Sequence, residues 1–320
     1  MKIAILDDWQ RIARSTADWS PLEARAEVVF FEAPFVDADD AAGQLADFDI
    51  IFALRERTPF PVSLIERLPK LKMFALAGFR AAMIDIAALI DRGVVVCGTD
   101  GGPSVESTAE LALALMLAAA RKIPAGDTAV RSGRFQVGTE AGFQLAGKTI
   151  GLIGLGRIGA LMARYCTALD MEVLAWSPNL TDERAAAAGA IYAPLDSLLD
   201  RSDAVSMHLV LSERTRGVLG APELARVKPG TIVINTSRAA LIEQQALLDA
   251  VAEGRIVAAL DVHYVEPMPP GHPFHAARNT VLTPHLGYSV LDVYAVYLQQ
   301  SVENILAYLD GTPTRVLARP

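Results

Sequence analysis

Three side chains suited to hydride-transfer chemistry follow predicted strands in this 320-residue sequence. Arg238 lies in Asn-Thr-Ser-Arg-Ala, Glu266 in Asp-Val-His-Tyr-Val-Glu-Pro and His285 in Thr-Pro-His-Leu-Gly. A guanidinium can hold a carboxylate by paired hydrogen bonds, and an imidazole beside a carboxylate can move a proton near neutral pH. Combined with a dinucleotide site, these groups predict hydride transfer to a small 2-oxo acid.

A glycine-rich turn supplies the expected dinucleotide site. Its sequence is Gly154-Leu-Gly-Arg-Ile-Gly159, between an apolar run and a helical pattern. The first glycine allows a tight turn, the second lets a pyrophosphate approach the backbone, and the third allows close packing of helix on strand. The helix start would offer unpaired N–H groups to phosphates. The residues expected to bind cofactor here are Gly154, Gly156, Arg157, Ile158 and Gly159; a plain glycine-rich helix start is the alternative.

Ser177 occupies the position where dinucleotide sites usually carry an acidic residue for the ribose hydroxyls. A carboxylate there would repel the 2′-phosphate of NADP, whereas serine does not. The sequence therefore leaves the cofactor open between NAD and NADP. A turn residue before Pro178, with no ribose contact, is the alternative for Ser177.

These groups must be positioned by two sets of alternating strands and helices, a pattern that predicts parallel sheets. The first set has expected strands at 2–6, 28–31, 50–53, 73–77 and 94–97, and helices at 41–46, 63–67 and 84–92. The second has strands at 149–153, 172–175, 204–207, 231–234, 256–260 and 280–282, and helices at 157–169, 181–188, 196–200 and 243–253. A strongly apolar helix is expected over 104–122, and a last helix over 290–310 that could return to the first domain. The predicted fold class is α/β with two Rossmann-like domains.

Composition and charge also restrict the partners and the cell compartment that we expect. The formal charge of −8 and the absence of a basic stripe argue against a nucleic-acid partner. No apolar run approaches the roughly 20 residues of a membrane span, and the two cysteines, Cys97 and Cys166, favour a reducing compartment, so a cytoplasmic protein is expected. His263, His272 and His275 lack the spacing of a metal site, and no metal is expected.

From the Leu71–Gly78 segment through Ala109-Glu110 to Thr283-Pro-His-Leu-Gly, the chain resembles the D-isomer-specific 2-hydroxyacid dehydrogenases. The resemblance implies a discontinuous, flavodoxin-like substrate domain at 1–100 and 286–320. It also implies an inserted dinucleotide-binding domain at 101–285, a substrate cleft between the two, and a homodimer formed through residues 105–121. The substrate would be a small anionic 2-oxo or 2-hydroxy acid.

The resemblance also implies residue roles. Arg238 would bind the substrate and polarise its ketone, His285 would be the general acid and base, and Glu266 would orient the imidazole. Further cofactor contacts would come from His208, Thr236, Asp261 and Gly287. Further substrate contacts would come from Ala77 and Gly78, through backbone N–H groups, and from Arg55, for which a solvated surface charge is the alternative.

Three positions depart from the family pattern: Ala239 replaces a usual glycine, Val210 a usual proline, and Phe79-Arg80 usual small residues. Arg80 could add a second cation and favour a dianionic substrate. Two other functions stay open. One is a non-catalytic NAD(H)-sensing regulator on the same scaffold. The other is a formate- or phosphite-type dehydrogenase, although the formate enzymes that resemble this family carry Gln where this chain has Glu266.

Overall fold

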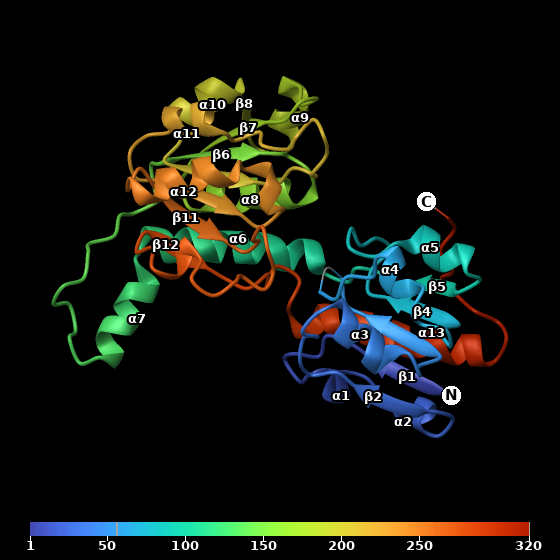
Figure 1. Cartoon of the computed structure of the whole chain (residues 1–320). Helices are drawn as coiled ribbons and strands as arrows, with labels where there is room; N and C mark the ends of the chain where they lie inside the picture. Colours follow the sequence, from blue (N-terminus) through green and yellow to red (C-terminus); the bar gives the residue numbers. More distant parts are fainter. Residues whose placement is uncertain (56, 320) are drawn as a thin grey trace. The chain divides into compact units, whose positions relative to one another are not determined.

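The computed structural model describes residues 1–55 and 57–319 and contains two compact units (Figure 1). Unit 1 comprises Met1–Pro103 and the chain from Val290 onward, and unit 2 comprises Ser104–Ser289. Each unit is built on a parallel sheet with helices on both faces. The predicted α/β fold with two Rossmann-like domains is confirmed.

The sheet of unit 1 has five strands in the order β2-β1-β3-β4-β5. They are β1 (Lys2–Ile5), β2 (Glu27–Phe30), β3 (Ile50–Ala53), β4 (Met73–Leu76) and β5 (Val95–Gly98). The central strands are continuous apolar runs because helices cover both of their faces. The order reverses between β1 and β3, and ligands of open α/β sheets bind at the carboxyl end of such a switch point.

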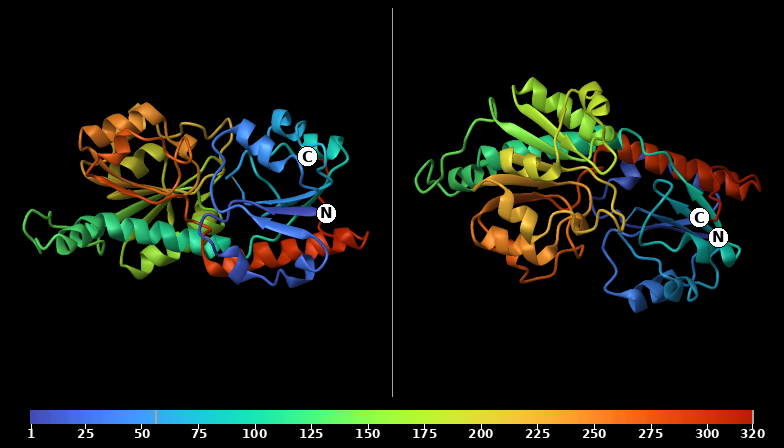
Figure 2. Two further views of the ribbon diagram at one scale, coloured as in Figure 1. Left: turned by 60° about the horizontal axis from the view of Figure 1, so that its bottom comes forward. Right: turned by 90° about the horizontal axis from the view of Figure 1, so that it is seen from above.

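Six helices cover this sheet, three on each face. The face shared with the long C-terminal helix carries α1 (Ala13–Thr16), α2 (Ser20–Glu23) and α13 (Leu291–Leu309), and the other carries α3 (Ala38–Leu45), α4 (Val62–Ile65) and α5 (Ile86–Asp91) (Figure 2). The carboxylates of Asp37 and Asp85 begin α3 and α5, since each accepts a backbone N–H of the first turn. The return of α13 to this sheet makes unit 1 discontinuous.

The sheet of unit 2 has seven strands in the order β12-β11-β10-β9-β6-β7-β8. They are β6 (Thr149–Ile153), β7 (Glu172–Trp176), β8 (Ile191–Tyr192), β9 (Ala204–Met207), β10 (Thr231–Asn235), β11 (Ile256–Leu260) and β12 (Thr280–Leu282). The expectation of six strands was wrong, because β8 has two residues and is too short to give a periodic pattern. The switch point lies between β6 and β9.

Two layers of helices bury the faces of this sheet. One contains α6 (Ser104–Ala120), α8 (Arg157–Ala168) and α9 (Asp182–Ala187), and the other α10 (Leu195–Arg201), α11 (Ala221–Arg226) and α12 (Gln244–Ala252). Helix α7 (Ile123–Arg131) follows α6, and two 3-10 turns span Ala239–Leu241 and Pro273–His275. No helix in the described ranges could cross a membrane.

Candidate active site

The three side chains expected to do chemistry all lie in unit 2, beyond the carboxyl ends of three neighbouring strands. Arg238 follows β10, Glu266 follows β11 and His285 follows β12, and these strands are adjacent and parallel. The carboxyl ends of parallel strands meet at one edge of a sheet, which is where α/β proteins place their sites. The topology therefore places three segments that are distant in sequence at one edge of the sheet.

His285 and Glu266 form a direct pair. The Nδ1 atom of His285 is 2.7 Å from Oε2 of Glu266, and the two side chains are 15% and 26% exposed. Burial favours a higher pKa for Glu266, but the hydrogen bond and charge of His285 and the N–H group of His263 together hold the pKa below its ordinary value. The carboxylate thus stays ionised and fixes the imidazole, with Nε2 as the ring nitrogen outside this pair.

His263, in the same loop as Glu266, also contacts the carboxylate. The backbone N–H of His263 donates to Oε1 of Glu266 over 2.8 Å, and Nε2 of His263 lies 3.0 Å from the carbonyl oxygen of Thr283. His263 lies in the loop after β11, and its two bonds connect this loop to the His285 loop. Because the contact with Glu266 uses a backbone N–H, the residue type at position 263 gave little signal for it.

Asp261 builds the loop that carries His285. It is fully buried at the end of β11, and Oδ1 accepts the N–H of Leu286 and the hydroxyl of Thr283, each over 2.6 Å. Its Oδ2 accepts the N–H of Gly287 over 2.9 Å, while its carbonyl accepts the N–H of His285. These bonds hold His285 in its left-handed backbone conformation, at φ 55°. Contacts of Asp261 and Gly287 with a cofactor stay predictions.

Asn235 shapes the turn that carries Arg238. Its buried amide donates to the carbonyl oxygen of Arg238 over 3.0 Å and accepts the N–H of Ser237 over the same distance. Nη1 of Arg238 donates to the carbonyl oxygen of Ser237 over 2.7 Å. Sequence reasoning treated Asn235 only as part of the motif, although asparagine commonly folds a turn back on its own backbone. Ala239, which departs from the family pattern, begins the 3-10 turn directly after Arg238.

The glycine turn has the shape that a pyrophosphate needs. Gly154 has φ 106°, and a Cβ there would lie 2.6 Å from the carbonyl carbon and oxygen of His208, while one on Gly159 would collide with the carbonyl oxygen of Gly154. A Cβ on Gly156 would meet nothing within 4 Å. Helix α8 begins at Arg157 with no side-chain cap, so its first N–H groups face the open space beside Gly156. The turn therefore fits a dinucleotide.

Two polar atoms that follow the neighbouring strands β9 and β10 lie buried with no hydrogen-bond partner among the described residues: Nδ1 of His208 and Oγ1 of Thr236. Buried polar groups are nearly always paired, so such atoms suit a ligand. Nε2 of His208 lies 2.9 Å from Oγ of Ser206, and burial lowers the pKa of His208 to about 4, which keeps the ring neutral. Val210 beyond it is 84% exposed, so this departure from the family pattern leaves the core unchanged.

Ser177 follows β7 at the turn next to the glycine turn. Its carbonyl oxygen accepts the N–H of Leu180 over 3.1 Å, which makes a compact turn. Nη1 of Arg184 donates to the carbonyl oxygen of Asn179 within this turn over 3.0 Å. A cation thus lies in the segment where an NAD site usually carries an acid.

The predicted substrate contacts Arg55, Ala77 and Gly78 lie in unit 1, after the adjacent strands β3 and β4. The N–H of Ala77 donates to the carbonyl oxygen of Ala53 over 3.1 Å, and that of Gly78 to Oγ1 of Thr99 over 2.8 Å. Both groups expected to hold a carboxylate are therefore engaged within the unit. Arg80 is exposed, and Phe79 packs against Gly98.

Comparison with known proteins gives one consistent result. Residues 113–287 match the family model described as "D-isomer specific 2-hydroxyacid dehydrogenase, NAD binding domain". A D-3-phosphoglycerate dehydrogenase of Archaeoglobus fulgidus is 38% identical over 82% of this chain and 50% of its own length. A hydroxypyruvate reductase of Blautia hydrogenotrophica is 30% identical over 99% of both chains.

Solved structures agree in fold. A crystal structure of a putative D-3-phosphoglycerate dehydrogenase from Ralstonia solanacearum superposes with a TM-score of 0.91 at 36% identity, covering 100% of this chain and 97% of the other. The chain spans about half the length of several phosphoglycerate dehydrogenases that it matches.

Proposed function

The chain belongs to the D-isomer-specific 2-hydroxyacid dehydrogenase family, and we propose that it interconverts a small 2-oxo acid and its D-2-hydroxy acid by hydride transfer. The observation that carries this proposal is the 2.7 Å pair of His285 and Glu266. The pair lies at the sheet edge that also carries Arg238 and the glycine turn. A proton donor, an anion-binding group and a dinucleotide turn on one edge are the groups that this reaction needs.

We propose NAD(H) as the cofactor, since the matched model describes an NAD-binding domain. Gly154, Gly156 and Gly159 would hold the pyrophosphate with the first N–H groups of α8, from Arg157 and Ile158. Other contacts would come from Ser177, His208, Thr236, Asp261 and Gly287. When bound, the dinucleotide supplies or accepts the hydride.

The residues of the chain handle the proton and the charge. His285 donates a proton from Nε2 to the carbonyl oxygen during reduction, and accepts it again in the reverse direction. Glu266 stabilises the imidazolium and keeps its ring oriented. Arg238 binds the carboxylate and stabilises charge on the oxygen that becomes the hydroxyl, an effect worth about 3 kcal/mol in a closed site. Because Ala77 and Gly78 donate their N–H groups within unit 1, we assign the main anion contact of that unit to Arg55.

The test is steady-state turnover of the wild-type protein and two variants. NADH and NADPH are each offered with glyoxylate, hydroxypyruvate and larger 2-oxo acids. We expect Arg238→Ala and His285→Ala to lower kcat by about 100-fold or more while NADH binding, followed by fluorescence, is retained. Arg226→Ala, at an exposed arginine at the end of α11, is the matched control. Near-normal turnover in both variants would end the proposal. Wild-type protein that binds NADH but reduces none of the acids would favour an NAD(H)-sensing regulator.

We also propose a homodimer in the cytoplasm. Large apolar side chains are exposed on and after α7, at Ile123, Val130, Phe135 and Val137, and monomers seldom leave such groups in water without a partner. This surface adjoins α6 in sequence, where the dimer contact is expected. Light scattering of the wild type and of Val130→Asp tests it, and a monomeric wild type would refute it. The two cysteines are free and buried, which suits a reducing compartment.

A further inference from the structure

The switch point of the unit 1 sheet holds a buried carboxylate that the catalytic scheme does not use. Asp7 follows β1 and is 5% exposed, and Leu54 to Thr58 follow β3, the strand across the switch point. Asp7 has φ 64°, a left-handed conformation that aspartate tolerates better than most residues.

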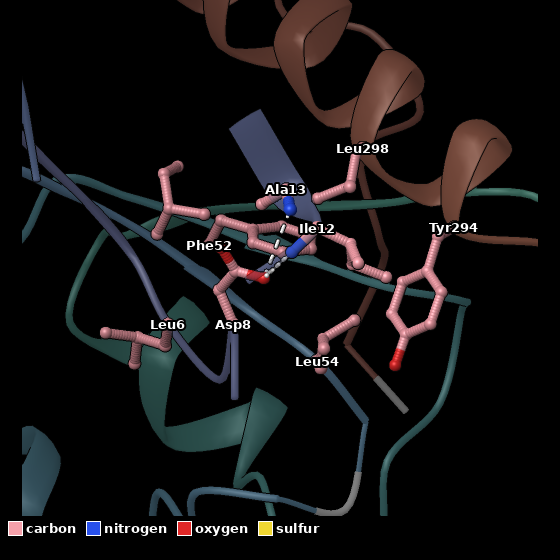
Figure 3. Close-up of a pocket in the computed structure, with 9 residues that line it drawn as sticks. Leu6, Asp8, Ile12, Ala13, Phe52, Leu54, Tyr294 and Leu298 are labelled. Atoms are coloured by element: carbon pink, nitrogen blue, oxygen red, sulfur yellow. Dashed lines mark hydrogen bonds between the residues drawn. The ribbon is translucent and has the colours of Figure 1, made fainter. Parts of the chain in front are cut away.

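The carboxylate of Asp7 holds the loop after β3 at both of its ends. Oδ1 accepts the hydroxyl of Thr58 over 2.6 Å, and Oδ2 accepts the N–H of Leu54 over 3.2 Å. The neighbouring Asp8 is turned elsewhere, because its Oδ1 accepts the N–H groups of Ile12 and Ala13 in a small cavity beside α13 (Figure 3). Two adjacent buried carboxylates thus have separate tasks: among the described residues, that of Asp7 bonds to Leu54 and Thr58, and that of Asp8 to the start of α1.

Arg55 lies between the two ends that Asp7 holds. Its Cδ atom is 3.0 Å from the place that a Cβ on Gly78 would take, so its side chain lies across the Gly78 turn. Its Nε atom is buried without a hydrogen-bond partner among the described residues. A buried guanidinium N–H in this state suits an anionic ligand. On the same loop, the guanidinium of Arg57 lies 4.9 Å from the ring centre of Trp9, which adds a second fixed point.

We propose that Asp7 is a positioning residue for substrate binding, whose carboxylate fixes Leu54 and Thr58, on either side of Arg55, so that Arg55 lies against the Gly78 turn. The proposal rests on the proposed function, because it takes Arg55 as an anion contact of the 2-oxo acid. Arg55 would hold the substrate carboxylate equally before and during hydride transfer. Loss of its position therefore raises KM and leaves kcat nearly unchanged.

The experiment compares two variants that break this arrangement from opposite ends. Asp7→Asn keeps the size of the side chain and tolerates the left-handed backbone, but its single acceptor oxygen cannot serve the backbone N–H groups of both Leu54 and Thr58. Thr58→Val removes the hydroxyl from the other end. Asp8→Asn is the matched control, an adjacent buried carboxylate whose Oδ1 accepts backbone N–H groups at the start of α1.

We expect both test variants to raise KM for glyoxylate or hydroxypyruvate about tenfold, with kcat and the Kd of NADH within about twofold of wild type. The inhibition constant of oxalate, a planar analogue, should rise in parallel, and amide exchange at Leu54 and Thr58 should become faster. The control should keep the wild-type KM. If the wild type is active and KM is unchanged in both test variants, the role of Asp7 is overturned while the proposed function stands. A wild type without turnover on any 2-oxo acid overturns the proposed function and this role with it.

Discussion

Replacing Glu266 by Gln tests whether the carboxylate beside His285 controls proton transfer. In the wild type, Oε2 lies 2.7 Å from Nδ1 of His285 and Oε1 accepts the N–H of His263 over 2.8 Å. Gln can present one acceptor, so its NH₂ group must face a second donor. A hydrogen bond to a charged group contributes about 1.5 to 3 kcal/mol. Loss of that stabilisation of the imidazolium corresponds to about a 10- to 150-fold fall in the rate of reduction.

The assay is the rate of NADH oxidation with a saturating 2-oxo acid between about pH 5 and about pH 9. Reduction takes its proton from the imidazolium, and Glu266 stabilises that cation, so the variant should be slower than the wild type at each pH. The same substitution at Glu253, an exposed residue at the end of α12, should change neither rate nor profile. A Glu266→Gln profile that superposes on the wild type, with kcat within about twofold, would refute the assigned role.

Three further predictions concern the cofactor and the stability of unit 1. Ser177→Asp should improve the preference for NADH over NADPH, measured as the ratio of kcat/KM values, by about tenfold or more, because a carboxylate repels the 2′-phosphate; an unchanged ratio would place the ribose elsewhere. Gly156→Val should leave the free energy of unfolding within about 0.5 kcal/mol, since a Cβ there meets no protein atom within 4 Å, yet weaken NADH binding about tenfold or more; equal NADH affinity in calorimetry would argue against a pyrophosphate at this turn. Burial raises the pKa of Asp7 from 3.8 to about 6 despite its bonds to Thr58 and Leu54 and the charge of Arg57. The contribution of this group to the free energy of unfolding therefore falls by about 3 kcal/mol as pH rises from about 4 through about 6. In urea unfolding, Asp7→Asn should lack this fall, and equal pH dependence of the two proteins would contradict the prediction.

Much of the catalytic edge could be predicted from the sequence because parallel sheets place sequential strand ends together. Four of the six strands expected in unit 2 have the predicted bounds, among them β11 and β12, which precede Glu266 and His285. Apolar runs ended by polar residues gave the strands, and alternation with helices gave their parallel direction. The side chains of Glu266 and His285 then meet because their loops leave neighbouring strands at the same edge.

The supporting residues could not be predicted in the same way. His263 contributes a backbone N–H, and any residue but proline has one, so its identity carries little signal. The cofactor contact of Asp261 stays a prediction, and its three side-chain bonds to the 283–287 loop depend on a fold of that loop that no local pattern encodes. The two-residue strand β8 is paired only because β7 lies beside it. In each case the interaction depends on tertiary neighbours rather than on periodicity.

Asp7 illustrates why stability and function must be considered together. A buried carboxylate with a raised pKa is mostly ionised at neutral pH, at a cost to the folded state. An apolar or amide side chain could fill the same space beside β1 more favourably if packing were its only purpose. The charge lies under the loop that carries Arg55, and it bonds to both ends of that loop. If the variants show that stability improves while substrate affinity falls, the cost of the buried charge is explained by the position that it gives to Arg55.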